Sequence, residues 1–179
     1  MKKQLLMLLL FLSVFTGLQA VTKDEVNRTI ISVHTKVFGK NDLFKEQINQ
    51  EDAIKWHEML QEVQKYIIEN AQGNKLLLNL LEKAVLDGYI IVNNSRRIYS
   101  MVFQEKVKNS IAWAKKQLAQ LEERKKAIIR SDKNLKSQIL TGNQKNAKEV
   151  LTNLLLVLEL TINKLIKDFN KDLVRVAIK

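Results

Sequence analysis

The chain contains no cysteine and no proline among its 179 residues, and only five glycines. Without cysteine, disulfides, thiolate metal sites, cysteine nucleophiles and a lipid anchor on an N-terminal cysteine are all excluded. Proline costs about 3 kcal/mol inside a helix and glycine about 1 kcal/mol, so a chain with almost none of either favours long helices. Alternating stretches of β-branched residues are also missing, which argues against long strands. The composition therefore predicts an all-α fold that is stabilised by packing alone.

The first twenty residues have the pattern of a secretory signal peptide. Residues 1–3 (Met-Lys-Lys) give a charged start, residues 5–15 are almost entirely apolar, and the segment ends on the small residue Ala20. The apolar run is about half as long as a membrane-spanning helix, and the pattern favours export and cleavage after Ala20. We expect a removed signal peptide over 1–20, a single helical domain over 21–179 without a transmembrane helix, and a periplasmic or extracellular location in a bacterium.

Short polar clusters indicate where the first helices of the mature chain begin and end. The first helix is expected over 22–37. Asn49, with Asp52 three residues further on, is a capping arrangement for the second helix. An apolar face of that helix is predicted from spacings of four, three and four residues, at Trp56, Leu60, Val63 and Ile67.

Gly73 predicts a left-handed C-cap, and the asparagine after it can cap the next helix. From residue 75 we expect a helix that continues with little interruption to about residue 130, kinked at most at 93–95. Polar clusters at 131–132 and 141–143 then bracket a short element. The last helix is predicted from about residue 143 to about residue 176.

Two apolar seams with alternating steps of three and four residues predict coiled-coil-like packing. The first comprises Val107, Ile111, Ala114, Leu118 and Leu121, and the second comprises Leu151, Leu155, Leu158, Ile162, Leu165, Phe169 and Leu173. Residues 151–166 are apolar over more than half of the helix circumference, which predicts a central helix packed on two sides. Membrane insertion, the alternative, is opposed by interrupting polar residues such as Glu159 and Lys164. The expected fold is an elongated all-α bundle of three to five long antiparallel helices.

The formal net charge is +11, and it is unevenly distributed. Residues 21–103 hold 11 basic and 11 acidic side chains and are neutral, whereas residues 104–136 hold 10 basic and 4 acidic. Residues 137–179 add 7 basic and 4 acidic side chains. The positive charge therefore belongs to the C-terminal half of the chain.

Catalytic chemistry has few candidate residues. His34 and His57 each lack a carboxylate or second histidine three or four positions away, so a helix-borne metal site is not expected. No phosphate-binding loop, nucleophile elbow or metalloprotease motif occurs. We predict structural roles for both histidines, core positions for Trp56 and Trp113, no cofactor, no metal and no enzymatic activity.

The basic segment is the best candidate for a binding site. The residues that we expect to carry it are Lys115, Lys116, Arg124, Lys125, Lys126 and Arg130. Such a cluster can attract acidic proteins, anionic lipid headgroups or polysaccharide. It can equally be a solvated helix face that is partly neutralised by pairs such as Glu122 with Lys126. Nucleic acid is disfavoured by export and by the scarcity of aromatic side chains that could stack on bases.

These observations favour an exported, non-enzymatic helical interaction protein. It would present apolar seams for self-association or a protein partner, and a basic face to an anionic partner or to the envelope surface. Three alternatives remain open: an accessory subunit of an envelope-spanning conjugation or secretion apparatus, a periplasmic holdase, and a membrane-permeabilising protein.

Overall fold

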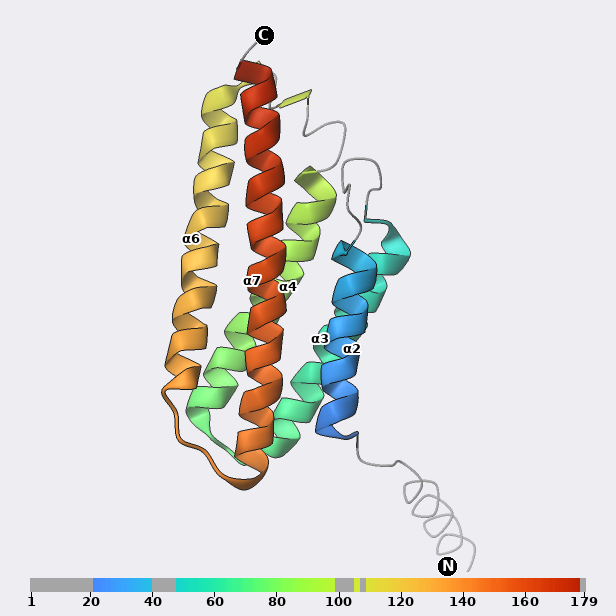
Figure 1. Cartoon of the computed structure of the whole chain (residues 1–179), viewed down its shortest axis with the longest axis vertical. Helices are drawn as coiled ribbons and strands as arrows, with labels where there is room; N and C mark the ends of the chain where they lie inside the picture. The colour runs from blue at the N-terminus through green and yellow to red at the C-terminus, as the bar shows by residue number, and fades with distance from the viewer. Residues whose placement is uncertain (1–20, 40–47, 99–104, 107–108, 178–179) are drawn as a thin grey trace, which may run out of the picture.

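The structure, a computed structural model, describes residues 21–39, 48–98, 105–106 and 109–177. The expected signal peptide lies outside these residues. The helices are α2 (Lys23–Phe38), α3 (Gln50–Asn70), α4 (Lys75–Ile98), α6 (Ile111–Lys136) and α7 (Gly142–Ala177), and the described parts of the chain contain no strand (Figure 1). The prediction of an all-α bundle is confirmed.

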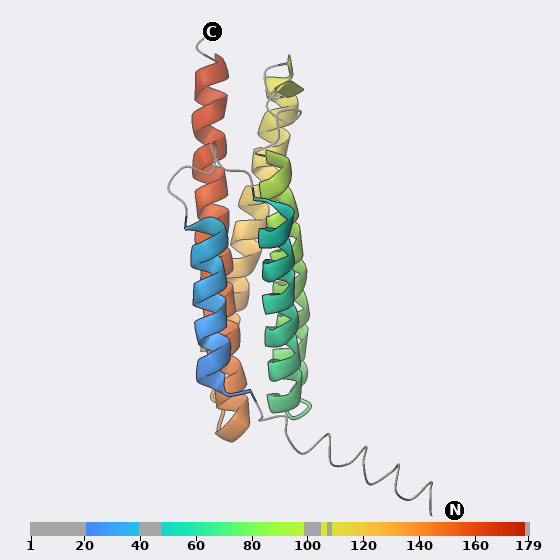
Figure 2. The same cartoon turned by 90° about the vertical axis from the view of Figure 1, so that its right-hand side faces the viewer.

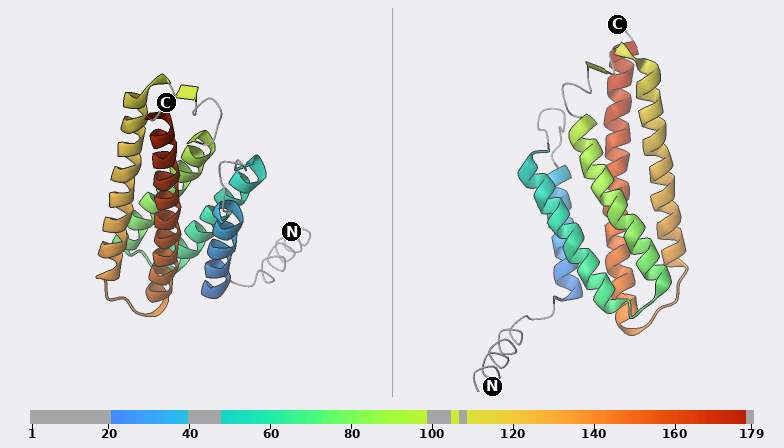
Figure 3. Two further views of the ribbon diagram at one scale, coloured as in Figure 1. Left: turned by 45° about the horizontal axis from the view of Figure 1, so that its top comes forward. Right: turned by 180° about the vertical axis from the view of Figure 1, so that it is seen from behind.

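The central helix of the bundle is α7, which packs against each of the other four. In Figure 1, α7 and α2 lie in front, α6 lies beside α7 on the left, and α4 and α3 lie behind; Figure 2 shows that α6 is set back from the front layer, and the reverse view in Figure 3 shows α3 and α4 in front. Helices α2 and α4 run parallel to α7, and α3 and α6 run antiparallel to it. Figure 2 shows that α7 continues well beyond the end of α2.

The first two helices begin at side chains that cap them through local hydrogen bonds, of which the sequence predicted the one at Asn49. Thr22 caps α2 in a capping box, in which its hydroxyl accepts from the Glu25 amide and its own amide donates to the Glu25 carboxylate at 2.8 Å. Asn49 Oδ1 accepts from the Asp52 amide at 2.7 Å at the start of α3. Between α3 and α4, Gly73 has a φ of +75°, a left-handed conformation that glycine adopts without strain. Both predicted helix starts and the predicted break at Gly73 are confirmed.

The prediction of a near-continuous helix from residue 75 to about residue 130 is wrong. Helix α4 ends at Ile98 where the described part stops, and α6 begins at Ile111 and runs back in the opposite direction (Figure 1). Folding the chain back lets both helices bury apolar side chains against α7, which a single rod could not do. Helix α4 continues through residues 93–95 to Ile98, and the hydroxyl of the buried Ser95 donates to the Ile91 carbonyl at 2.7 Å.

The short element expected after residue 131 is also absent, because α6 continues through Asp132 to Lys136. Leu135 is fully buried, so the apolar face of α6 extends one turn beyond the polar pair at 131–132. Lys136 pairs with Asp132 one turn away at 2.6 Å, which further supports the helical turn. Tertiary burial therefore overrides the polar signal here. The predicted bounds of the last helix, by contrast, agree with α7 to within one residue at each end.

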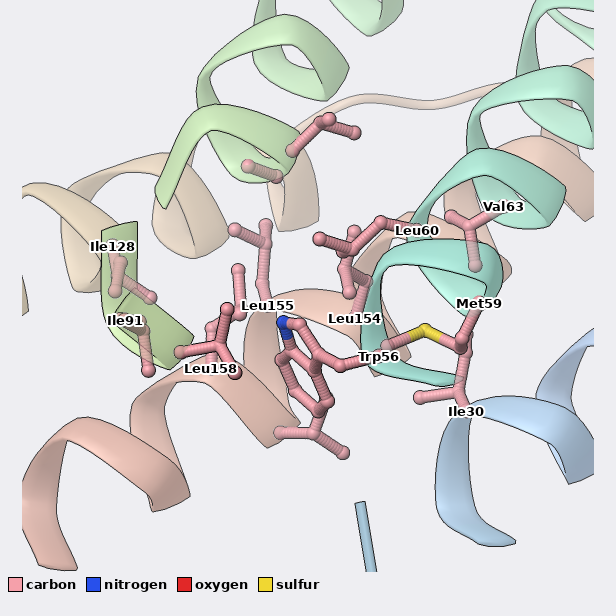
Figure 4. Close-up of a cluster of buried hydrophobic side chains, with 14 of the residues drawn as sticks. Ile30, Trp56, Met59, Leu60, Val63, Ile91, Ile128, Leu154, Leu155 and Leu158 are labelled. Atoms are coloured by element: carbon pink, nitrogen blue, oxygen red, sulfur yellow. The ribbon is translucent and has the colours of Figure 1, made fainter. Parts of the chain in front are cut away.

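The core combines buried side chains from all five described helices, from Ile30 on α2 to Ile128 on α6 (Figure 4). Trp56 is fully buried, and its indole Nε1 donates to the carbonyl of Gly88 on α4 at 3.0 Å. A Cβ atom at Gly88 would come within 2.8 Å of the Leu60 side chain, so glycine is what allows α3 and α4 to approach this closely. The predicted face of α3 is confirmed, because Trp56, Leu60, Val63 and Ile67 are all buried.

The apolar seam of α7 is also turned into the core. Its members from Leu151 to Phe169 are all buried, whereas the side chain of Leu173 lies outside the described residues. In α6 the buried residues recur every seven positions, at Ala114, Leu121, Ile128 and Leu135. Leu118 is partly buried, Ile111 is 38% exposed, and Val107 lies outside the described residues. The expected central position of residues 151–166 is confirmed. Over the part of the chain that the structure describes, no helix is both long and apolar enough to cross a membrane.

A basic face on helix α6 as the candidate binding site

The six predicted site residues all lie on α6, but the structure divides them into two groups. Lys115, Lys116, Lys126 and Arg130 are exposed, whereas Arg124 and Lys125 are half-buried. Because an α-helix turns 100° per residue, the four exposed residues fall within about 100° of its circumference, on the side opposite Leu121 and Ile128. The structure thus brings four of the six onto one open face.

Lys133, which the sequence reasoning missed, belongs to the same face. It is exposed, and it lies 18 residues from Lys115, which is five full helical turns. The signal that could have found it is the seven-residue step from Lys126, which places it on the same side of the helix. We call the set Lys115, Lys116, Lys126, Arg130 and Lys133 the basic face.

The basic face extends over about 27 Å of helix, at 1.5 Å per residue. Between described residues, no ion pair engages any of its five cations. The expected pairing of Glu122 with Lys126 is not formed, and Glu123 is the one exposed carboxylate within the described helix that shares this side. The face therefore keeps nearly all of its positive charge directed at solvent.

Arg124 has a structural partner instead. Its guanidinium forms an ion pair with the carboxylate of Asp87 on α4, and the two side chains are 30% and 14% exposed. Burial raises the pKa of Asp87, and the nearby Arg124 partly offsets that rise. This pair joins α6 to α4 at a point where both charges are shielded from solvent.

Beside this ion pair, α4 and α6 diverge and leave a groove of about 540 Å³. Its lining is a mixture of aliphatic and amide side chains with one charged pair of neighbours: Ile90, Asn94, Ile98, Gln117, Gln120, Leu121, Glu123, Arg124 and Ala127. Among the described residues, the only ionisable side chains that line it are Glu123 and Arg124.

The two histidines lie at helix interfaces. His34 is partly buried and stacks on Phe38, with ring centroids 5.9 Å apart, and burial followed by the charge of Lys164 lowers its pKa. His57 contacts the ring of Tyr89 at 4.8 Å, and its buried Nε2 has no hydrogen-bond partner among the described residues. Within those residues, no three His, Cys, Asp or Glu side chains gather in an arrangement that could hold a metal ion.

Trp56 fills the core as predicted, and Trp113 is partly buried and packs against the core.

No protein-family model matches the chain, and neither does a curated protein or a solved structure.

Proposed function

We propose that this protein is an exported, non-enzymatic helical interaction protein that binds an acidic partner through the basic face of α6. The observation that carries the proposal is the arrangement of five exposed cations along five turns of one helix, without ion pairs to the described residues. Elsewhere in the bundle, cations such as Lys23 and Lys55 lie beside carboxylates. Charge that is left open on one face raises the rate at which an oppositely charged partner encounters it.

The shape of the face favours a protein partner over a small ligand. A straight row of cations about 27 Å long matches an acidic helix or an extended acidic segment of similar length. Small molecules are bound in concave pockets, and the basic face lies on the convex side of α6.

Export rests on the leader pattern of residues 1–20. A cytosolic protein whose measured mass retains those residues would contradict it.

The test compares two triple variants that carry the same change in charge. K126Q/R130Q/K133Q removes three cations from the basic face, and K65Q/K75Q/K83Q removes three exposed cations from α3 and α4. Binding of each purified protein to poly-glutamate is measured at low and high salt. We expect the face variant to bind at least about fivefold more weakly, the control to bind like the wild type, and wild-type binding to fall steeply with salt.

Equal weakening of the two variants would assign binding to the net charge and not to the face. Salt-independent binding would contradict an electrostatic mechanism altogether.

A further inference from the structure

A second surface of the molecule lies on the solvent side of α7, between α2 and α6 (Figure 1). Leu156 and Leu160 are 52% and 51% exposed there, although α7 is otherwise the most enclosed helix of the bundle. The residues that share their side of the helix follow steps of four, three, four, three and four: Glu149, Asn153, Leu156, Leu160, Asn163 and Lys167. We call these six residues the outer stripe of α7; each is at least partly exposed.

Exposed apolar residues of the two neighbouring helices lie level with the leucines. Three hydrogen bonds fix the register of α2 against α7, and each joins residues 126 positions apart: Lys23 to Glu149, Asn27 to Asn153, and Lys164 to the Phe38 carbonyl. Ile31, which is 58% exposed, is therefore level with residue 157.

On α6 the corresponding residue is Ile129, which is 41% exposed. Because α6 is antiparallel to α7 and Lys148 donates to the Lys136 carbonyl at 3.1 Å, Ile129 is level with about residue 155. It lies on the side of α6 away from the groove with α4. The leucines are thus flanked by an exposed isoleucine on each side.

The outer stripe is complementary to itself when it is read in reverse. A two-fold axis at the level of Leu158 places Leu156 opposite Leu160 of another copy, Asn153 opposite Asn163, and Glu149 opposite Lys167. Apolar residues then meet at the centre, amides meet on either side, and opposite charges meet further out. A parallel arrangement would instead place Glu149 on Glu149 and Lys167 on Lys167, which is unfavourable.

The same axis brings Ile31 close to Ile31 of the other copy, since the level of Leu158 on α7 corresponds to residue 32 on α2. Beyond the stripe, Lys145 would face Lys171. This like-charged pair lies roughly 20 Å from the centre, at the rim, where solvent and salt screen it.

We propose that a second copy of this chain docks antiparallel on this face, with the outer stripes of the two α7 helices in contact. The part of this face that α7 and α2 form is two helices wide and about 27 Å long, which offers roughly 500 Å² per copy, the size of a weak, concentration-dependent interface. The outer stripe and the basic face share no residue, so each can be altered by substitution without changing the side chains of the other.

Sedimentation velocity over a range of concentrations tests whether the dimer forms. We expect a monomer–dimer equilibrium for the wild type, weakened at least 100-fold by L156K/L160K, because each substitution enters the symmetric interface twice. The matched control I54K/L86K changes two equally exposed apolar residues on α3 and α4 and should dimerise like the wild type. A wild type that stays monomeric, or a dimer that L156K/L160K does not weaken, would overturn the proposal.

Charge reversal tests the antiparallel register. E149K and K167E should each weaken the dimer roughly tenfold, because each creates two like-charged pairs across the interface. The combined variant E149K/K167E restores both pairs and should recover wild-type affinity. Since Glu149 also pairs with Lys23 in the same copy, circular dichroism of each variant confirms that the monomer remains folded. Single variants that weaken the dimer without rescue by the combined one would exclude this register.

Discussion

Helices α2 and α6 flank α7 on opposite sides, yet they are attached to it by different interactions. α2 is connected to α7 along its whole length by polar contacts, at Lys23, Asn27 and the Phe38 carbonyl. α6 is joined to α7 by polar contacts near its C-terminal end, where Lys148 donates to the carbonyls of Lys136 and Gln138. Along the rest of α6, one buried residue in every seven faces the core.

The difference determines where charge accumulates. α2 holds three basic and two acidic residues, and two of its polar side chains bond to α7. α6 holds eight basic and three acidic residues, and its outer side meets no described helix. An edge helix held by a narrow apolar stripe leaves most of its circumference to solvent, so it can carry a charged surface without loss of stability. This is why the candidate binding site is found on α6 and not on α2.

The largest expected effect comes from the narrow stripe of α6. Ile128→Ala removes a fully buried side chain and should lower the free energy of unfolding by about 3 kcal/mol, through lost burial and a cavity. Ile129→Ala is the matched control, because the side chain of Ile129 is 41% exposed. This substitution should lower the free energy of unfolding by less than about 1 kcal/mol. Urea unfolding followed by circular dichroism measures the free energy of unfolding of both variants. Equal losses would contradict the conclusion that Ile128 faces the core and Ile129 faces solvent.

An intermediate effect is expected at the ion pair between α6 and α4. Arg124→Gln leaves the Asp87 carboxylate shielded without its cation and should destabilise the protein by about 1.5 kcal/mol at neutral pH. Burial already raises the pKa of Asp87, and loss of Arg124 removes the effect that opposes this rise. The loss should shrink as the pH falls through the pKa of Asp87, because a neutral carboxyl group needs no cation.

The same substitution made in an Asp87→Asn background provides the control. Without the carboxylate, Arg124→Gln should cost much less, and the pH dependence of its cost should disappear. An equal cost in both backgrounds would show that the guanidinium stabilises the protein by packing and not by pairing.

The smallest effect is expected at the interface of α2 with α7, where it appears as a pH dependence. His34 has a folded-state pKa below its ordinary value of 6.5, chiefly because of burial. The unfolded chain therefore binds the proton more readily than the folded one, and the stability due to the neutral imidazole is present above pH 6.5 and lost as the pH falls below it. His34→Gln should flatten this part of the stability profile, measured by urea unfolding at a series of pH values. An unchanged slope would assign the pH dependence to other groups.

Local signals in the sequence were sufficient for most helix boundaries. The caps at Thr22 and Asn49 and the turn at Gly73 depend on hydrogen bonds and backbone angles within a few residues, which the sequence specifies directly. The break between Ile98 and Ile111 was missed, because the chain there lacks proline and a glycine cap. At the basic face, Arg124 was wrongly included, because only the position of α4 shows that this side of α6 is enclosed. Lys133 was left out although its seven-residue step from Lys126 is visible in the sequence.

Sequence alone determined that the chain is helical and that it carries most of its excess positive charge in the C-terminal half. Both follow from composition and from interactions between near neighbours. Tertiary structure decided that α7 is central, that Arg124 turns inward to Asp87, and that Leu156 and Leu160 stay outside while the leucines beside them are buried. These outcomes depend on which helices pack against which, and that choice is made by burying apolar surface between residues far apart in the chain.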